Sequence, residues 1–189
     1  MYGIFSEDKS DFETLKVLIQ RLAIDEKIQF CGKGFNGCGE LLKHAWRNLK
    51  SQADMGCTRF VIAHDADQRD FRDVQRDLVD KIIKPSGIKK SICLLVPVQE
   101  IEAWLLADVC AASNLFKGWM PKPEPNPESI ARPKEYLEKL SRVASGSPRY
   151  RHAMHNPQLA KHIDLVKVSK SCPSFRPLET FVKCGKSNY

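Results

Sequence analysis

Residues 58–70 read TRFVIAHDADQRD, and this stretch decides the fold that we expect. The apolar run 59–63 is typical of a buried β-strand. Two aspartates, Asp65 and Asp67, follow it with one residue between them, and a charged helical segment comes next. A strand that ends in D-x-D before a helix presents its carboxylates at the carboxyl edge of an α/β sheet. We therefore expect the functional site at that edge.

The N-terminal part of the chain alternates between strand and helix patterns. Strands are expected at residues 2–6, 27–31, 59–63 and 91–98. The first helix carries an S-x-x-E capping box at Ser10 and Glu13, and the second follows the glycine-rich residues 32–40. The strands are apolar enough to be covered on both faces. The pattern predicts an α/β fold over residues 1–112, a Rossmann-like parallel four-stranded sheet flanked by helices.

Residues 113–189 differ in character. Five prolines between residues 117 and 133 predict a linker or wrapping loop, and short helices are expected from Pro133, from Asn156–Pro157 and near Ser174. Residues 142–189 hold nine Lys or Arg against two acidic residues, which accounts for the whole net charge of +7. This basic helical C-terminal extension suits a polyanion, and a solvated tail or a docking surface for an acidic partner explains the charge equally well. The residues expected to contact nucleic acid are Arg149, Arg151, Lys161, Lys167, Lys170 and Arg176.

The cysteines and the hydropathy pattern narrow the class of protein. Seven cysteines form no C-x-x-C pair and leave one over, which argues against a disulfide framework or a zinc ribbon, so we expect mostly buried thiols. No apolar run approaches the roughly 18 residues of a membrane span, and the first residues lack the pattern of a signal peptide. We expect a soluble cytoplasmic protein that does not contact a membrane.

Acidic residues fall at the expected ends of three strands. Glu7 follows the first strand, Asp65 and Asp67 follow the third, and Glu100 or Glu102 follows the fourth. The alternation of side chains along a strand predicts that the two aspartates point to the same side. Converging carboxylates repel one another unless a cation lies between them, and oxygen ligands suit Mg²⁺ or Mn²⁺. Helix capping explains any one of these residues alone, but the set favours a metal site.

The acidic residues also resemble a known family. Glu7 in FSEDKSD, followed two strand–helix units later by DAD in VIAHDADQRD, resembles the TOPRIM domain of topoisomerases, primases, RNase M5-type maturases and OLD-family nucleases. VQEIEAWLLAD lies where OLD-like nucleases have a further acidic motif. EIEAWLLAD, PESIARPKEYL and CPSFRPLETF are similar to small TOPRIM-like proteins of unknown function, often found near ATPases in prokaryotic phage-defence loci. The TOPRIM resemblance covers roughly residues 1–112, with Asp8 where glycine is common.

The resemblance implies a metal-dependent endonuclease that cleaves phosphodiester bonds in DNA or RNA, an effector of anti-phage defence with an ABC- or SMC-type ATPase as partner. Mg²⁺ or Mn²⁺ would be the cofactor, and Glu102, preferred to Glu100, would hold a second ion or act as a base. Lys134, with Arg176 as the alternative, would supply a cation for the phosphate. The implied metal ligands are Glu7, Asp11, Asp65, Asp67, Glu100 and Glu102.

Two other classes of function remain as alternatives. The first is a catalytically silent subunit of the same fold, which binds nucleic acid or a partner protein without turnover. The second is a phosphatase or phosphotransferase of the haloacid dehalogenase type, which also uses D-x-D. That family carries its nucleophile on the first strand, whereas the motif here follows the third, so the second alternative is disfavoured.

Overall fold

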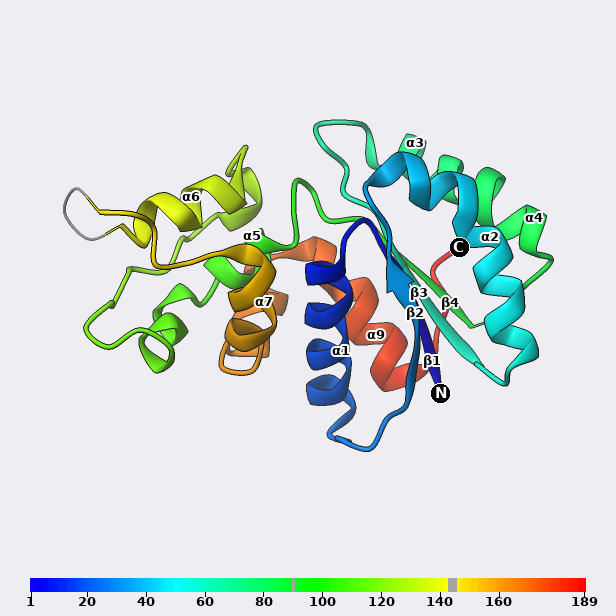
Figure 1. The fold of residues 1–189 in the computed structure, drawn as a ribbon, viewed down its shortest axis with the longest axis horizontal. Coiled ribbons are helices and arrows are strands. Elements are labelled where there is room, and N and C mark those ends of the chain that lie inside the picture. Colours follow the sequence, from blue (N-terminus) through cyan, green and yellow to red (C-terminus); the bar gives the residue numbers. More distant parts are fainter. Residues whose placement is uncertain (90, 143–145) are drawn as a thin grey trace.

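The computed structural model describes residues 1–89, 91–142 and 146–189 and has an α/β fold (Figure 1). One sheet of four parallel strands runs through it in the order β2-β1-β3-β4. The expected parallel four-stranded sheet flanked by helices is thus confirmed. The strands are β1 (Tyr2–Ser6), β2 (Phe30–Gly34), β3 (Arg59–Ala63) and β4 (Ile92–Leu95).

Helices cover both faces of the sheet (Figure 1). On the first face lie α1 (Lys9–Ala23) and α9 (Arg176–Cys184), and α7 (His152–Ala160) packs against α1. The second carries α2 (Cys38–Asp54), α3 (Phe71–Leu78) and α4 (Lys84–Ser86), with the π-helical turn Val79–Ile83 between the last two. The other α-helices are α5 (Glu102–Leu106), α6 (Pro133–Leu140) and α8 (Leu165–Ser171). Short 3₁₀ turns span Val109–Asn114, Pro127–Ser129 and Pro173–Phe175.

The sheet separates two hydrophobic clusters, and side chains alternate between them along each strand. In β3, Val61 packs into the cluster beneath α1, while Ile62 packs into the cluster beneath α2. The first cluster also contains three fully buried aromatic side chains from the C-terminal segment: Tyr150, Phe175 and Phe181. Burying a side chain of this size contributes about 1.5–3 kcal/mol. Residues 113–189 therefore share a core with the N-terminal part of the chain.

The second strand lies three residues later in the sequence than expected. Its glycines belong to the strand, because an added Cβ at Gly32 would lie 1.9 Å from the carbonyl oxygen of Ile4. Gly32 also has a φ of +107°, and a Cβ at Gly34 would lie 2.0 Å from the carbonyl oxygen of Asp8. Gly32 and Gly34 thus belong to the strand and not to the segment between strand and helix, and they permit β2 to lie close to β1 and to the start of α1.

Two helix starts also differ from the expectation. The N-cap of α1 is Asp8, whose Oδ1 accepts a hydrogen bond of 2.9 Å from the backbone N of Asp11, so the capping box at Ser10 is wrong. The hydroxyl of Ser10 instead donates to the carbonyl of His152, 3.1 Å away, and ties α1 to α7. Helix α7 begins at that residue, and Pro157 lies inside the helix. The Ser10 hydroxyl thus contacts α7 and does not form the local capping box with Glu13.

The end of the chain covers the outer edge of β4. The side chain of Asn188 both donates to and accepts from the backbone of Leu94, at 2.8 Å each, and the Ser187 hydroxyl accepts from the backbone N of Ile92 at 3.1 Å. These contacts satisfy backbone groups that an edge strand would otherwise expose. Of the residues that the structure describes, none belongs to a helix with both the length and the apolarity needed to cross a membrane.

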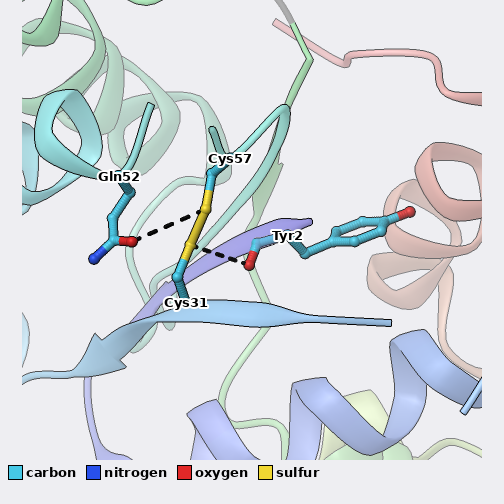
Figure 2. Close-up of a disulfide and its surroundings, with 4 residues drawn as sticks. All are labelled: Tyr2, Cys31, Gln52 and Cys57. Atoms are coloured by element: carbon cyan, nitrogen blue, oxygen red, sulfur yellow. Dashed lines mark hydrogen bonds between the residues drawn. A yellow bond between two sulfur atoms is a disulfide. The ribbon is translucent and has the colours of Figure 1, made fainter. Parts of the chain in front are cut away.

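The cysteines do not form the set of mostly buried thiols that the sequence indicates. Cys31 in β2 and Cys57 before β3 are joined by a disulfide (Figure 2). The Sγ atom of Cys31 lies 3.4 Å from the carbonyl oxygen of Tyr2. Of the free cysteines, Cys93 and Cys172 are buried, Cys110 is half-buried, and Cys38 and Cys184 are exposed. The expectation failed because spacing along the chain does not report which strand ends become neighbours.

Candidate functional site

The carboxyl ends of β1 and β3 meet at the D-x-D turn. Glu7 follows β1, and its Oε1 accepts a hydrogen bond of 2.9 Å from the backbone N of Asp65. The same oxygen lies 3.1 Å from Nδ1 of the buried His64, and the Nε2 of that ring has no partner among the described residues. The structure therefore brings together the glutamate and the aspartate motif, which are 58 residues apart in the sequence.

Two further carboxylates converge on this point. Asp11 lies in the first turn of α1, and both Asp11 and Asp65 are half-buried. Burial raises the pKa of each well above its ordinary value. The charge of Asp8 adds to the shift of Asp11, and the charge of Asp11 adds to the shift of Asp65. Within the described part of the chain, neither carboxylate accepts a hydrogen bond or forms an ion pair. The carboxylates of Asp11 and Asp65 therefore have neither a hydrogen-bond donor nor a cation in contact among the described residues.

Glu102 brings the third strand end into the cluster. Its side chain is 2% exposed at the start of α5, and its Oε1 accepts a hydrogen bond of 2.9 Å from Nδ2 of Asn156. Burial raises the pKa of Glu102 to about 7, although the nearby Lys134 opposes the shift. The Glu102 charge also raises the pKa of both Asp11 and Asp65, so its carboxylate faces the cluster.

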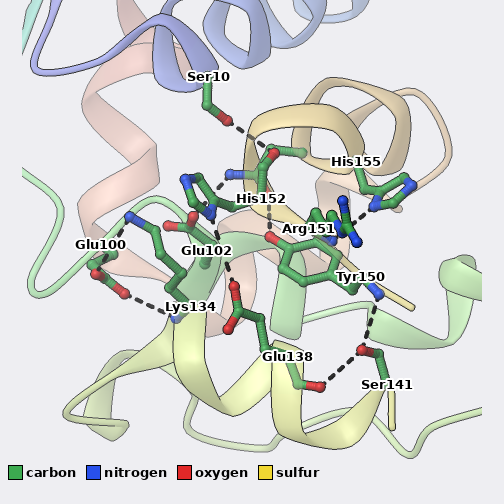
Figure 3. Close-up of polar contacts among 11 residues, drawn as sticks. Ser10, Glu100, Glu102, Lys134, Glu138, Ser141, Tyr150, Arg151, His152 and His155 are labelled. Carbon is green, nitrogen blue, oxygen red and sulfur yellow. Dashed lines mark hydrogen bonds and ion pairs between the residues drawn. The ribbon is translucent and has the colours of Figure 1, made fainter. Parts of the chain in front are cut away.

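Glu100 has a different role from Glu102. Its Oε2 accepts a hydrogen bond of 2.9 Å from the backbone N of Lys134, which lies at the start of α6 (Figure 3). The Lys134 ammonium lies 3.9 Å from the other Glu100 oxygen. Burial lowers the pKa of this lysine, but the carboxylates of Glu102 and Glu100 outweigh burial and raise it. Lys134 is therefore the charged amine beside these carboxylates, and Glu100 holds the helix that carries it.

Asp67 reaches the site through a turn. Strand β3 ends at Ala63, so the alternation from which we expected Asp65 and Asp67 to share a side does not extend to them. Asp67 is exposed and has a φ of +47°, and Gln68 follows with +67°. The Asp67 charge adds to the effect of burial in raising the pKa of Glu7 and of Asp65, so it still lies near the cluster. We refer to Glu7, Asp11, Asp65, Asp67 and Glu102 as the acidic cluster.

The expected nucleic-acid contacts are spread over the C-terminal segment. Arg176 donates to the carbonyl of Ser169 at 2.8 Å, which leaves Lys134 as the cation of the acidic cluster. Lys167 forms an ion pair of 2.8 Å with Asp108. The other four residues are Arg149, which donates to the carbonyl of Lys117 at 3.3 Å, and Arg151, Lys161 and Lys170, whose side chains are exposed. Part of the basic charge therefore holds the segment in place.

Sequence reasoning missed two polar residues of the site. The hydroxyl of Tyr150 donates to Oδ1 of Asn156, which in turn donates to Glu102, and all three side chains are buried. Figure 3 shows Tyr150 close to Glu102 and His152. No motif marks either residue, because their role arises only when α7 packs against α1 and α5. The chain of hydrogen bonds fixes the orientation of the Glu102 carboxylate.

The acidic cluster can be tested for its fit to a divalent ion. Among residues 1–89, 91–142 and 146–189, no group of three His, Cys, Asp or Glu side chains is arranged to hold a metal ion. The chemistry of the donors does fit Mg²⁺ or Mn²⁺, because Glu7, Asp11, Asp65 and Glu102 offer only oxygen atoms. Their raised pKa values reflect burial and, for Glu7, Asp11 and Asp65, repulsion by neighbouring carboxylates, which a cation would relieve. The donors fit the ion, whereas a closed coordination shell is not preformed.

The fold and the site define an α/β protein with a carboxylate cluster at the carboxyl edge of a parallel sheet. The chain belongs to the family described as domain of unknown function DUF4276, whose model matches residues 6–183. No curated protein and no solved structure matches the chain. The matched range includes the whole acidic cluster together with Lys134 and Asn156, so both segments of the chain lie within one family unit.

Proposed function

We propose that the chain is a Mg²⁺- or Mn²⁺-dependent nuclease of the TOPRIM type that cleaves phosphodiester bonds in DNA or RNA. The observation that carries this proposal is the pair of half-buried carboxylates of Asp11 and Asp65, which lack any donor among the described residues and lie beside Glu7 and Glu102. Carboxylates that are partly withdrawn from water and lie close to one another are unfavourable when charged in the absence of a ligand. A divalent ion would compensate their charge.

Each residue of the site has a role in this proposal. Glu7, Asp11, Asp65 and Asp67 would hold the ion, which when bound supplies Lewis-acid activation of water and of the leaving oxygen. Glu102 has a pKa of about 7 in the metal-free protein. In this proposal its carboxyl group would accept or return the proton, and Asn156 orients it. The ammonium of Lys134 would bind the phosphate and offset its negative charge.

A second candidate function is a catalytically silent subunit that binds nucleic acid or a partner protein. The specific observation in its favour is that no three metal-binding side chains of the described residues are arranged as a ready ligand set. Such a subunit would retain affinity for nucleic acid through its exposed cations. It would not release cleaved products under any divalent ion.

Nuclease activity is tested with the purified chain, Mg²⁺ or Mn²⁺, and a panel of plasmid, single-stranded DNA and tRNA. We expect cleavage that disappears in Asp65→Asn. The matched control is Asp73→Asn, an aspartate on the surface of α3 that pairs with Arg76. Cleavage that persists in Asp65→Asn would rule out this site as its source, and binding without cleavage under every ion would favour the silent subunit.

The biological setting is a separate part of the proposal. The resemblance to proteins of phage-defence loci supports a cytoplasmic effector that an ABC- or SMC-type ATPase restrains or delivers. Co-expression with an ATPase encoded next to the gene should change the rate of cleavage and protect cells from phage. Protection that is equal with Asp65→Asn would contradict a role of the nuclease site in defence.

A further inference from the structure

A pocket lies beside the acidic cluster and takes no part in the function proposed so far. It has a volume of about 480 Å³, within the ~300–1,000 Å³ range of small-molecule sites. Most of its wall surface is apolar, although Arg69 and Glu128 also line it, and the lining residues come from segments far apart in the chain. Ala66, Val96 and Val98, which follow β3 and β4, line it together with Phe71 of α3, and Pro173 and Pro177 line it from the C-terminal segment. We call this the apolar pocket.

The apolar pocket opens toward the acidic cluster through two glutamines. Gln68 and Gln99 line it, and they also line a hollow of about 210 Å³ that contains Asp67, Glu100 and Arg132. Asp67 belongs to the acidic cluster, so the two sites share a margin. The carboxamide groups at this margin can each donate and accept hydrogen bonds.

On its other side the apolar pocket continues toward the basic segment. Glu128 and Pro173 line both the pocket and a third hollow of about 480 Å³, which also contains Lys170. The three hollows therefore follow one another from the acidic cluster to an exposed lysine. Arg132 and Lys170, at the two ends, form no side-chain ion pair or hydrogen bond with any described residue.

Hydrogen bonds hold the pocket wall at Ser174 in place, whereas the pocket residue Phe71 is partly exposed to solvent. The indole Nε1 of Trp104 donates to the Ser174 hydroxyl at 2.9 Å, and the backbone N of Ser174 donates to Glu128 at 3.0 Å. These contacts preform the C-terminal wall and satisfy the Glu128 carboxylate. On the opposite rim, Phe71 is 44% exposed at the first position of α3. An aromatic ring left open beside a polar margin offers a stacking surface.

The backbone at the margin is strained. Asp67 and Gln68 are consecutive residues other than glycine with φ values of +47° and +67°. Such a conformation is uncommon and is maintained only where the surrounding structure demands it. Here the turn places Asp67 on the acidic side and Gln68 in both hollows. The strain therefore lies at the point where the pocket and the acidic cluster meet.

We propose that the apolar pocket binds one unstacked base of a single nucleic-acid strand next to the phosphate at the acidic cluster. A base has two flat apolar faces and a hydrogen-bonding edge, which match the ring of Phe71, the proline wall and the carboxamides of Gln68 and Gln99. Arg132 and Lys170 line the two neighbouring hollows, and in this proposal they would contact the phosphates on either side of that base. The inference rests on the proposed action on nucleic acid and names its substrate as a single strand.

The test measures binding of a short single-stranded oligonucleotide by fluorescence anisotropy, with Ca²⁺ in place of Mg²⁺. In a series of strands, one abasic position moves along the sequence. We expect one position at which loss of the base weakens binding on the order of 10-fold, the size of one stacking contact. Phe71→Ala and, as a second variant, Gln99→Ala should weaken binding of the intact strand and remove this penalty. The control Val166→Ala trims a side chain that is 77% exposed on α8 and should change neither.

The outcomes separate this inference from the nuclease proposal. Equal affinity for every abasic strand, equal affinity for duplex and single strand, or no binding to any strand would overturn the base pocket. Cleavage together with a flat abasic profile would refute the pocket and leave the nuclease standing. A single sensitive position without cleavage under any divalent ion would support the pocket and refute the nuclease.

Discussion

Replacing Glu102 by glutamine should stabilise the metal-free protein at neutral and alkaline pH. Glutamine has the same shape and keeps an oxygen that can accept the hydrogen bond from Asn156, so the change removes the charge and little else. In the folded protein, burial raises the pKa of Glu102 from 4.5 to about 7. A buried acid with a raised pKa binds its proton more tightly in the folded than in the unfolded chain.

The size and the sign of the effect follow from this shift. At about 1.4 kcal/mol per pKa unit, the change from 4.5 to about 7 corresponds to about 3 kcal/mol. The contribution of the group to stability is fully present below pH 4.5, falls as the pH rises through this interval, and is lost above pH 7. Glu102→Gln should therefore match the wild type in acid and exceed its free energy of unfolding by about 3 kcal/mol in alkali.

Urea unfolding in the presence of a chelator, repeated across this pH interval, gives the comparison. The matched control is Glu13→Gln, which makes the same chemical change at a side chain on α1 that is 39% exposed and pairs with Lys16. The control should follow the wild type at every pH. Parallel stability curves for Glu102→Gln and the wild type would refute the reasoning, because they would mean that the folded state imposes no penalty on the Glu102 charge.

Three other predictions concern the fold around the site. Gly32→Ala should prevent stable folding, because its Cβ would lie 1.9 Å from a β1 carbonyl oxygen. The control Gly39→Ala in α2 places its Cβ where nothing lies within 4 Å and should raise the melting temperature, so similar melting of both variants would contradict the close approach of β2. Tyr150→Phe leaves Asn156 without its donor and should lower the free energy of unfolding by about 1–3 kcal/mol, and an unchanged urea midpoint would count against the buried network. Asn188→Ala removes two hydrogen bonds to the edge of β4 and should cost about 1–2 kcal/mol with faster amide exchange in that strand, while unchanged exchange would mean that the edge is protected otherwise.

Local sequence patterns were sufficient to place those strands and helices whose bounds depend mainly on neighbouring residues in the chain. Strand β1 at residues 2–6 and strand β3 at 59–63 lie where the apolar runs predict them, and Pro133 begins α6 as expected. Strand β2 was misplaced because glycine is read as a loop signal, whereas Gly32 serves a contact with another strand. The start of α7 was misplaced for a similar reason, because its first residue contacts Ser10.

The acidic residues themselves were readable from the sequence, because strand ends of a parallel sheet share one edge and Glu7, Asp65 and Glu102 each follow a strand. The burial and the hydrogen-bond partners of these residues could not be predicted from the sequence. Which of Glu100 and Glu102 faces the cluster depends on two helices: α6, whose backbone N at Lys134 donates to Glu100, and α7, whose Asn156 donates to Glu102. The apolar pocket likewise needs the C-terminal segment to close against the D-x-D turn.

Taken alone, the sequence determined the parallel α/β sheet, the edge at which its acids gather and the uneven charge of the chain, because these depend on apolar periodicity and residue type. Tertiary structure alone decided how deeply each carboxylate is buried, which cation lies beside it, and that Asn156 and Tyr150 orient Glu102. Burial and hydrogen bonding between residues far apart in the chain follow from the packing of helices on the sheet, and no local pattern encodes them.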